Sequence, residues 1–398
     1  MKRLALIFLF FSGTLLSHAE VDKELLSAYA CFIKGEYATA ISNFTGLLDN
    51  KNISFSDDLR FMRAKCYYMQ GDFLKAKSDL QKLLNEDYSE ANLLIAKTNI
   101  KLNSTSDIYF YLERYLNLNK MADINVIKSD TCFKNLFLTD AWFDFWQDKN
   151  DSELQELTKD IRYLIKSKNY TEALSKLDTK EESGFLNYLR SMVYFESENI
   201  PQAFTYINKA LNTEPENITY LEQKALYLRH LSKYKEEIAI REKLTELIPW
   251  SFSNYLNLSE CYYSVNENDK AREFADLLVE YFPDSPKYNL LFAKIQLQAN
   301  DYLEALKTIN KVLKVSEQSY DVLIVRGTVY YKMGTYTQAA NDFSMSLDLK
   351  PTDAVAYFYL GNCNYKTGNS SAACYNWRKA AGYGSTDAIK AIIDYCQQ

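Results

Sequence analysis

The sequence predicts an all-α fold: an α-α superhelix of antiparallel helix pairs, closed by a C-terminal capping helix. The 398 residues contain only 11 glycines and 6 prolines, so residues that interrupt helices are scarce. Four of the prolines are also regularly spaced. Pro215, Pro249 and Pro283 recur every 34 residues, and Pro351 follows after twice that interval. Because proline cannot continue a helix, a recurring proline predicts a recurring helix end.

The first 19 residues are expected to form a secretory signal peptide. Lys2 and Arg3 precede an apolar stretch from residue 4 to 16, and Ser17, His18 and Ala19 supply a small-residue cleavage site. The apolar stretch is shorter than the roughly 20 residues that a membrane-spanning helix needs. The mature chain is therefore expected to be exported, to the periplasm of a Gram-negative bacterium.

Each 34-residue unit is expected to contain a first helix, a turn and a second helix. Small residues hold fixed places in this unit, because two helices that cross closely need a small side chain at the contact. Glycine falls at the expected turn at positions 334 and 368, and midway along the first helix at positions 327 and 361. A contact alanine recurs in the second helix at Ala203, Ala271, Ala305, Ala339 and Ala373.

These units resemble the tetratricopeptide repeat, a helix–turn–helix unit of 34 residues. The segment from Tyr320 to Pro351 agrees best, with Gly327, Tyr330, Gly334, Tyr336, Ala339, Phe343 and Pro351 in place. Further units start near Pro286, Phe252, Ile218, Gly184 and Leu154, and segments 31–44 and 66–80 show the same turn and alanine. The resemblance implies about ten units that stack into a solenoid.

The repeat loses its phase between residues 116 and 150, where we place a domain boundary. The expected parts are a signal peptide at 1–19, an N-terminal array at 20–150 and a C-terminal array with its cap at 151–398. An aromatic segment, residues 133–146, closes the first array. It could form a buried cap or an exposed docking surface. Ring pairs four residues apart, such as Trp142 and Trp146, favour the buried cap.

One repeat carries charges where the others are apolar. Glu237 occupies the contact-alanine position, and Arg241 follows one helical turn later. We expect the helix to be locally rotated, so that both side chains reach solvent. Otherwise they form a buried ion pair, which is costly and would indicate a site.

The final repeat, within residues 362–384, precedes an amphipathic segment that is expected to cap the stack. A short connection should place the two helices antiparallel and bring Cys374 near Cys396. Export would permit a disulfide between them. Two alternatives remain: a Cys363–Cys396 pair, or seven free and buried thiols.

The sequence indicates no enzyme, no cofactor and no metal site. His230 is the only histidine after the expected leader, and the seven cysteines form no CxxC pair. Phosphate-binding glycine loops and the HExxH pattern are absent. A net charge of −6 without a basic cluster argues against nucleic acid, and no apolar stretch downstream of the leader predicts a membrane span.

The resemblance implies a scaffold or adaptor that binds a protein or peptide of unknown identity in the groove lined by the first helices. A subunit of an outer-membrane assembly or secretion machine is an alternative of the same class. A hydrolase on a helical toroid belongs to another class, but it would show longer repeats. By the resemblance, the inward-facing residues include Tyr188, Phe195, Leu256, Tyr263, Leu290, Leu297, Ile324, Tyr331, Phe358 and Tyr365.

Overall fold

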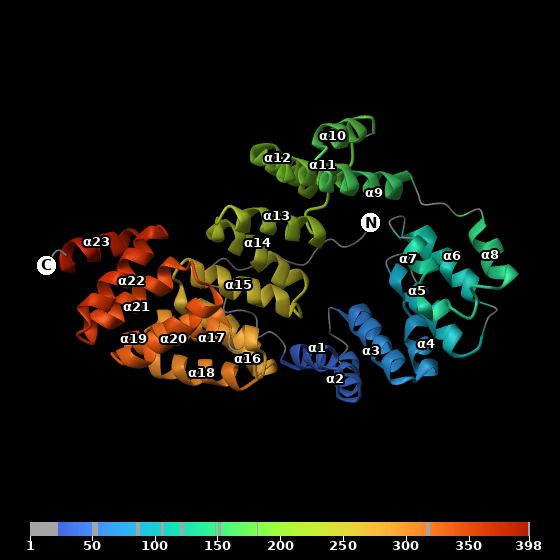
Figure 1. The fold of residues 1–398 in the computed structure, drawn as a ribbon. Coiled ribbons are helices and arrows are strands. Elements are labelled where there is room, and N and C mark those ends of the chain that lie inside the picture. Colours follow the sequence, from blue (N-terminus) through green and yellow to red (C-terminus); the bar gives the residue numbers. More distant parts are fainter. Residues whose placement is uncertain are drawn as a thin grey trace, which may run out of the picture. The chain divides into compact units, whose positions relative to one another are not determined.

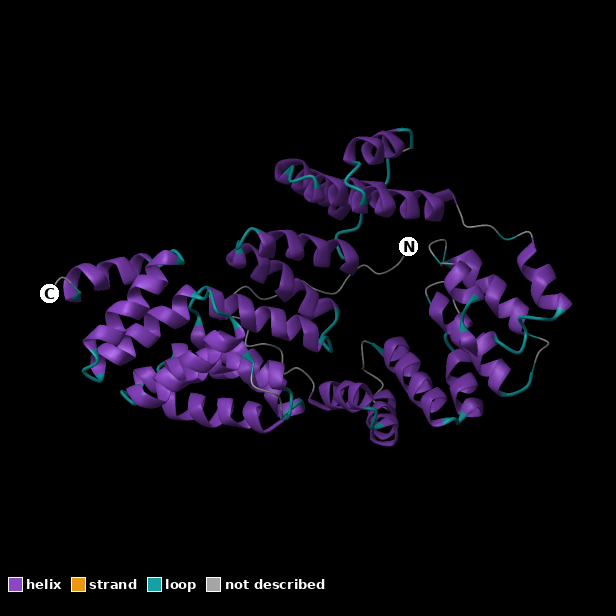
Figure 2. Ribbon diagram, viewed as in Figure 1, coloured by secondary structure: helices purple, strands orange, loops and turns teal. Residues whose placement is uncertain are grey.

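The computed structural model describes residues 23–49, 55–84, 88–104, 107–119, 122, 124–147, 149, 153–180, 182–315 and 319–396. Within these residues every regular element is a helix (Figure 2), which confirms the all-α prediction. The expected signal peptide lies outside the described residues. Backbone contacts divide the chain into two units, Met1–Ala203 and Phe204–Gln398, which we describe separately.

The first unit consists of short helices, of which the first six pack in chain order (Figure 1). They are α1 (Lys23–Lys34), α2 (Tyr37–Asp49), α3 (Ser56–Gln70), α4 (Phe73–Gln81), α5 (Ser89–Lys101), α6 (Ile108–Leu118), α7 (Ile124–Lys128), the 3-10 helix η1 (Thr131–Phe133), α8 (Asp140–Gln147), α9 (Glu153–Lys166), α10 (Tyr170–Asp178) and α11 (Gly184–Glu196). The next helix, α12 (Ile200–Thr213), begins in the first unit and ends in the second.

The second unit is a regular stack in which each helix packs against its neighbour in the chain. First helices also contact the first helix of the next pair, as α15 does α17 and α17 does α19. The helices are α13 (Ile218–His230), α14 (Tyr234–Leu247), α15 (Phe252–Ser264), α16 (Asn268–Tyr281), α17 (Pro286–Gln298), α18 (Tyr302–Val315), α19 (Tyr320–Lys332), α20 (Tyr336–Leu349), α21 (Ala354–Lys366), α22 (Ser370–Gly382) and α23 (Thr386–Tyr395).

A left-handed residue ends the first helix of each pair. At Gly334 the backbone N–H donates to the Tyr331 carbonyl (3.1 Å), and the N–H of Thr335 donates to the Tyr330 carbonyl (2.9 Å). These two bonds satisfy carbonyls that the helix end would leave free. Ten described turns repeat this pattern, with a positive φ at Gly35, Gly71, Asn103, Lys168, Glu198, Ser232, Asn266, Asn300, Gly334 and Gly368.

Small residues bring the helices of a pair close together, as the spacing predicts. The contact alanines at 203, 271, 305, 339 and 373 are all fully buried. A Cβ added to Gly361 would lie 2.5 Å from the Cδ1 atom of Trp377, so only glycine leaves room for this ring. The Trp377 Nε1–H donates to Oδ1 of Asn362 (2.9 Å), which satisfies its polar atom.

The aromatic segment 133–146 belongs to a hydrophobic core that begins at Ala64. Phe133, Trp142 and Trp146 are buried, and the Trp142 ring centre lies 5.5 Å from those of Phe133 and Trp146. Phe143 is the exception, since 69% of it is exposed. The packing supports the cap interpretation rather than an aromatic docking surface.

A separate core cluster extends from Leu157 to Val193 and involves α9, α10 and α11. The predicted boundary near residue 150 falls between this cluster and the preceding one. The main division of backbone contacts falls later, within α12. A division into independent arrays at residue 150 therefore stays a prediction.

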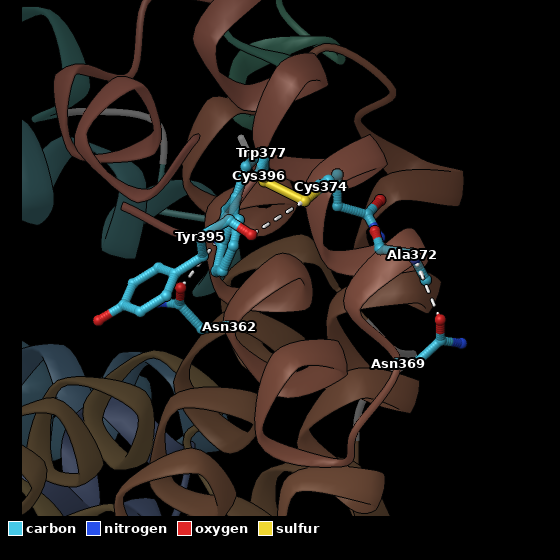
Figure 3. The surroundings of a disulfide bond; sticks show 8 residues. Asn362, Asn369, Ala372, Cys374, Trp377, Tyr395 and Cys396 are labelled. Atoms are coloured by element: carbon cyan, nitrogen blue, oxygen red, sulfur yellow. Dashed lines mark hydrogen bonds between the residues drawn. A yellow bond between two sulfur atoms is a disulfide. The ribbon is translucent and has the colours of Figure 1, made fainter. Parts of the chain in front are cut away.

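The capping helix α23 packs against α22, and its Ala388 and Ala391 are buried there. In the structure a disulfide joins Cys374 to Cys396 across this contact (Figure 3). Their Cα atoms lie 5.8 Å apart. Cys363 is a free and buried thiol, so the structure does not contain the alternative Cys363–Cys396 pair.

Candidate binding groove

We define the groove position as the residue three places before the left-handed residue that ends each first helix. Its carbonyl oxygen accepts the N–H of that turn residue, so the backbone fixes the same place in every first helix. Nine of the ten described turns have an aliphatic or aromatic residue here, and one has an arginine. In chain order the residues are Phe32, Tyr68, Ile100, Ile165, Phe195, Arg229, Tyr263, Leu297, Tyr331 and Tyr365.

The ten residues expected to face inward lie on first helices, and most are half-buried. Leu256 is buried and Tyr365 is exposed. Tyr331 packs against the rings of Tyr336 and Tyr359 at centroid distances of 5.6 and 5.3 Å, and burial raises the pKa of its hydroxyl. The Tyr365 ring lies 4.6 Å from that of Tyr395 in the capping helix. These two tyrosines therefore contribute to packing as well as to the surface.

The structure brings two of the expected residues, Tyr263 and Leu290, together in one pocket. It has a volume of about 320 Å³ and lies where α13, α14, α15 and α17 meet. Burial raises the pKa of the Tyr263 hydroxyl. Apolar and charged side chains both line this pocket: Arg229, Tyr234, Glu260, Tyr263, Ser264, Lys287, Leu290, Leu291 and Lys294.

A network of ion pairs lies beside this pocket. Arg229 Nε donates to both carboxylate oxygens of Glu237 (3.0 and 3.1 Å), and its Nη1 donates to Glu260 (2.7 Å). Arg241 Nε donates to Glu237 from the other side (3.1 Å). The guanidinium of Arg229 also reaches the Asn257 carbonyl (3.1 Å), so it links α13, α14 and α15.

The expectation that Glu237 and Arg241 reach solvent is wrong. Glu237 is completely buried and Arg241 is 8% exposed. Burial alone would lower the pKa of the Arg229 guanidinium, but Glu237 outweighs it and the pKa is raised. Burial also raises the pKa of the nearby Cys261 thiol to about 12, so this cysteine stays protonated at neutral pH. The alternative interpretation, a buried pair, is the correct one.

A larger pocket in the first unit was not expected from the sequence. Its volume is about 630 Å³, and the first helices α1, α3 and α5 line it together with the segment 130–134. Four lysines face it from different parts of the sequence, so no basic cluster is visible along the chain. The lining residues are Phe32, Lys65, Tyr68, Met69, Leu94, Lys97, Lys101, Asp130, Thr131, Cys132 and Lys134.

Among the described residues, no helix is long and apolar enough to cross a membrane. The same part of the chain contains no group of three His, Cys, Asp or Glu side chains that could hold a metal ion.

Antiparallel helix pairs that pack in sequence, with left-handed turns at fixed places, define the class of α-solenoid repeat proteins. Comparisons with known families identify the repeat. Residues 58–89 and 324–377 match the family described as tetratricopeptide repeat, and residues 264–346 match the family described as anaphase-promoting complex, cyclosome, subunit 3. The chain is a tetratricopeptide-repeat protein of the α-α superhelix class.

Curated proteins are similar to this chain over part or most of its length. DnaJ protein P58IPK homolog A of Oryza sativa subsp. japonica is 30% identical over 177 residues, which are 40% of this chain and 37% of the rice protein. The chain thus spans less than two fifths of that relative. A TPR repeat-containing protein of Methanocaldococcus jannaschii is 22% identical over 397 residues, covering 88% of this chain and 68% of its own length.

Two solved structures show the same fold. A tetratricopeptide repeat protein from Parabacteroides merdae has a TM-score of 0.51 at 17% identity and covers 61% of this chain and 98% of its own. The APC/C hetero-tetramer Cut9-Hcn1 has a TM-score of 0.50 at 15% identity and covers 94% of this chain and 83% of its own. Tetratricopeptide-repeat proteins bind protein partners and are generally non-catalytic scaffolds.

Proposed function

We propose that this protein is an exported scaffold that holds an extended peptide segment of a partner protein against its first helices. The observation that carries the proposal is the chemical uniformity of the groove position. Nine of ten described turns present an aliphatic or aromatic side chain at this one place. Apolar side chains in register suit a partner segment that inserts apolar anchors at intervals.

The second unit offers the best-defined place for such an anchor. Tyr263 and Leu290 line a pocket of about 320 Å³, which is at the small end of the range for ligand pockets. Lys287 and Lys294 line the same pocket and could bind polar atoms of the partner's backbone or side chains. An apolar centre with a few polar groups at its edge is typical of peptide-binding surfaces.

Site-specific photo-crosslinking tests the proposal. A photoreactive phenylalanine analogue replaces Tyr263, and crosslinking is performed in cells that produce the protein. We expect a discrete protein adduct whose crosslinked peptide can be identified by mass spectrometry. Because Tyr263 lines the pocket, the analogue is placed to react with a partner group that enters it.

The matched control is Tyr375, a tyrosine on the second helix α22 that is 58% exposed. The same adduct from both positions would indicate non-specific contact and contradict the proposal. Absence of any adduct at Tyr263, Leu290 and Tyr331 would also contradict it. An adduct at the groove positions with none at Tyr375 would support it.

Export is a separate part of the proposal, and it is based on the basic, apolar and small-residue order of residues 1–19. The mature protein is expected to begin at Glu20 in the periplasmic fraction of a Gram-negative cell. Intact-mass measurement of the fractionated protein checks this. An unprocessed N-terminus in the cytosolic fraction would contradict export without affecting the groove.

A further inference from the structure

The pocket of about 630 Å³ lies in the first unit, and none of the ten residues that the resemblance places in the groove lines it. We call it the lysine pocket; Lys65, Lys97, Lys101 and Lys134 line it, together with a single acidic residue, Asp130. The chain as a whole carries a net charge of −6, so a local excess of lysine opposes its overall balance. Such an excess attracts anionic ligands.

Asp130 is already engaged within the protein. Its carboxylate lies 2.6 Å from the ammonium group of Lys97, and it accepts the backbone N–H of Cys132 (2.8 Å). Burial opposes ionisation of Asp130, but the hydrogen bonds from Lys97 and Cys132 outweigh it and its pKa is lowered. Asp130 therefore neutralises one lysine and leaves three.

The other three lysines form no ion pair within the described part of the chain. Among the described residues, no carboxylate lies within ion-pair distance of Lys65, Lys101 or Lys134. Lys65 is half-buried, and its ammonium group lies 4.6 Å from the ring centre of Phe61. Burial lowers the pKa of Lys65, because a charged group that loses water is destabilised, and the attraction of Glu90 from beyond ion-pair distance does not offset this effect. A bound anion would supply a counter-ion.

The rest of the pocket lining is apolar. Phe32 and Tyr68 occupy the groove positions of the first two repeats, and Leu94 follows on α5. Met69 is 57% exposed, and its flexible thioether can adapt to different side chains. The segment 130–134, which lies where the repeat loses its phase, forms one side of the pocket. Its Cys132 Sγ lies 3.4 Å from the Tyr68 hydroxyl.

We propose that the lysine pocket binds a peptide segment in which a carboxylate stands next to an apolar side chain. This inference rests on the proposed function and names the chemistry of the partner. The lining contains no arginine, the residue whose planar fork suits phosphate. Lysine ammonium groups beside apolar side chains instead suit a peptide that carries both acidic and hydrophobic groups. Its carboxylate can come from Asp or Glu side chains or from the end of a chain.

Fluorescence anisotropy with three labelled peptides tests the proposal on the full-length protein. The first peptide alternates Glu and Phe and has an amidated end. The second ends in Phe with a free carboxylate and has no acidic side chains. The third replaces each Glu of the first by Gln. We expect the first or second peptide to bind and the third to bind at least about tenfold more weakly, because hydrogen bonds to charged groups are the strong ones.

Two variants with opposite expected effects identify the site. The double substitution Lys65→Gln and Lys101→Gln should weaken binding of the acidic peptide about tenfold. Asp130→Asn should tighten binding, since it frees Lys97 while an amide oxygen can still accept the Cys132 N–H. A gain in affinity cannot result from misfolding.

The matched control is Lys235→Gln with Lys311→Gln, which removes the same charge from exposed positions on α14 and α18. This control should leave the affinity unchanged. Equal binding of acidic and neutral peptides, no binding of either acidic peptide, or equal losses in control and pocket variants would overturn the proposal. These outcomes can be distinguished from failure of the proposed function, because crosslinking at Tyr263 in the second unit tests that proposal separately.

Discussion

At the scale of single residues, one repeat carries charged side chains at positions where the other repeats are apolar. Arg229 occupies the groove position, which is Tyr331 three repeats later. Glu237 occupies the contact position, which is Ala339 in that later repeat. Arg241 occupies the place of Leu80 in an earlier repeat. Glu237 accepts hydrogen bonds from both arginines, so the three charged residues together replace an apolar contact.

Removal of one of these charged side chains should therefore lower the free energy of unfolding far more than replacement of all three. Glu237→Ala leaves two guanidinium groups without their shared carboxylate and should lower the free energy of unfolding by about 3–5 kcal/mol. The triple variant Arg229→Tyr, Glu237→Ala and Arg241→Leu restores the residue types of other repeats and should recover most of that loss. Urea unfolding followed by circular dichroism measures both effects.

The adjacent residue supplies the control. Glu236 is exposed and forms a solvent-exposed ion pair with Lys233, so Glu236→Ala should change the stability by less than about 1 kcal/mol. If Glu237→Ala is as mild as Glu236→Ala, the network does not stabilise the fold.

The same repeat shows what the sequence could and could not predict. The period and the small residues predicted the helix pairs, because glycine at 327 and 361 and alanine at the contact positions follow from close packing. The sequence predicted a turn only where glycine occurs between two helices, as at Gly334. Lys168 and Glu198 adopt the same left-handed backbone without any sign in their residue type. Burial of Glu237 depends on Arg229, which lies eight residues earlier on another helix. The spacing of the sequence alone does not show that these two side chains meet.

At the scale of elements, the capping helix is held by both packing and a covalent bond. Trp377 is buried beneath it, and the Tyr395 ring lies 5.9 Å from that of Trp377 (Figure 3). The helix itself is short and has Ile389 and Ile393 exposed on its outer side. A short helix with a limited buried face should depend strongly on its tether.

Reduction of the Cys374–Cys396 disulfide is expected to loosen α23 selectively. The bond closes a loop with a sequence separation of 22, for which the chain-entropy estimate is about 3 kcal/mol. Hydrogen exchange should show faster exchange in α23 after reduction, and little change in α13 to α18. The double variant Cys374→Ser and Cys396→Ser should behave like the reduced protein with or without reductant.

Peptide mapping of unreduced, alkylated protein checks the pairing itself. Cys363 should react only after unfolding, because it is buried and burial raises its pKa to about 12. Alkylation of both Cys374 and Cys396 without reduction would rule out the tether. A peptide linking Cys363 to Cys396 would show that the other pairing had formed.

At the scale of the whole molecule, two positions compete as the boundary of an independent folding unit. The hydrophobic core changes between Trp146 and Leu157, whereas the main division of backbone contacts lies within α12. Helices α9, α10 and α11 form a cluster among themselves. Repeat stability is largely a sum of neighbouring interfaces, so a cut between clusters should leave the remaining repeats intact.

A fragment of residues 151–398 is therefore expected to fold without the preceding array. Its circular dichroism should show a helical spectrum, and its unfolding midpoint in urea should lie close to that of the full chain. A fragment of residues 204–398, which cuts α12, serves as the comparison and should be less stable. An insoluble or unfolded 151–398 fragment beside a stable full chain would contradict a boundary near residue 150.

The link between Arg229 and Glu260 also constrains how this array can evolve. Each unit of a solenoid contacts mainly its neighbours, so loss of a copy joins two units that were not adjacent before. Loss of α15 and α16 would join α14 directly to α17, where Lys294 holds the place of Glu260. Two cations would then meet beside the buried Glu237. Charge repulsion thus opposes loss of this copy at this seam.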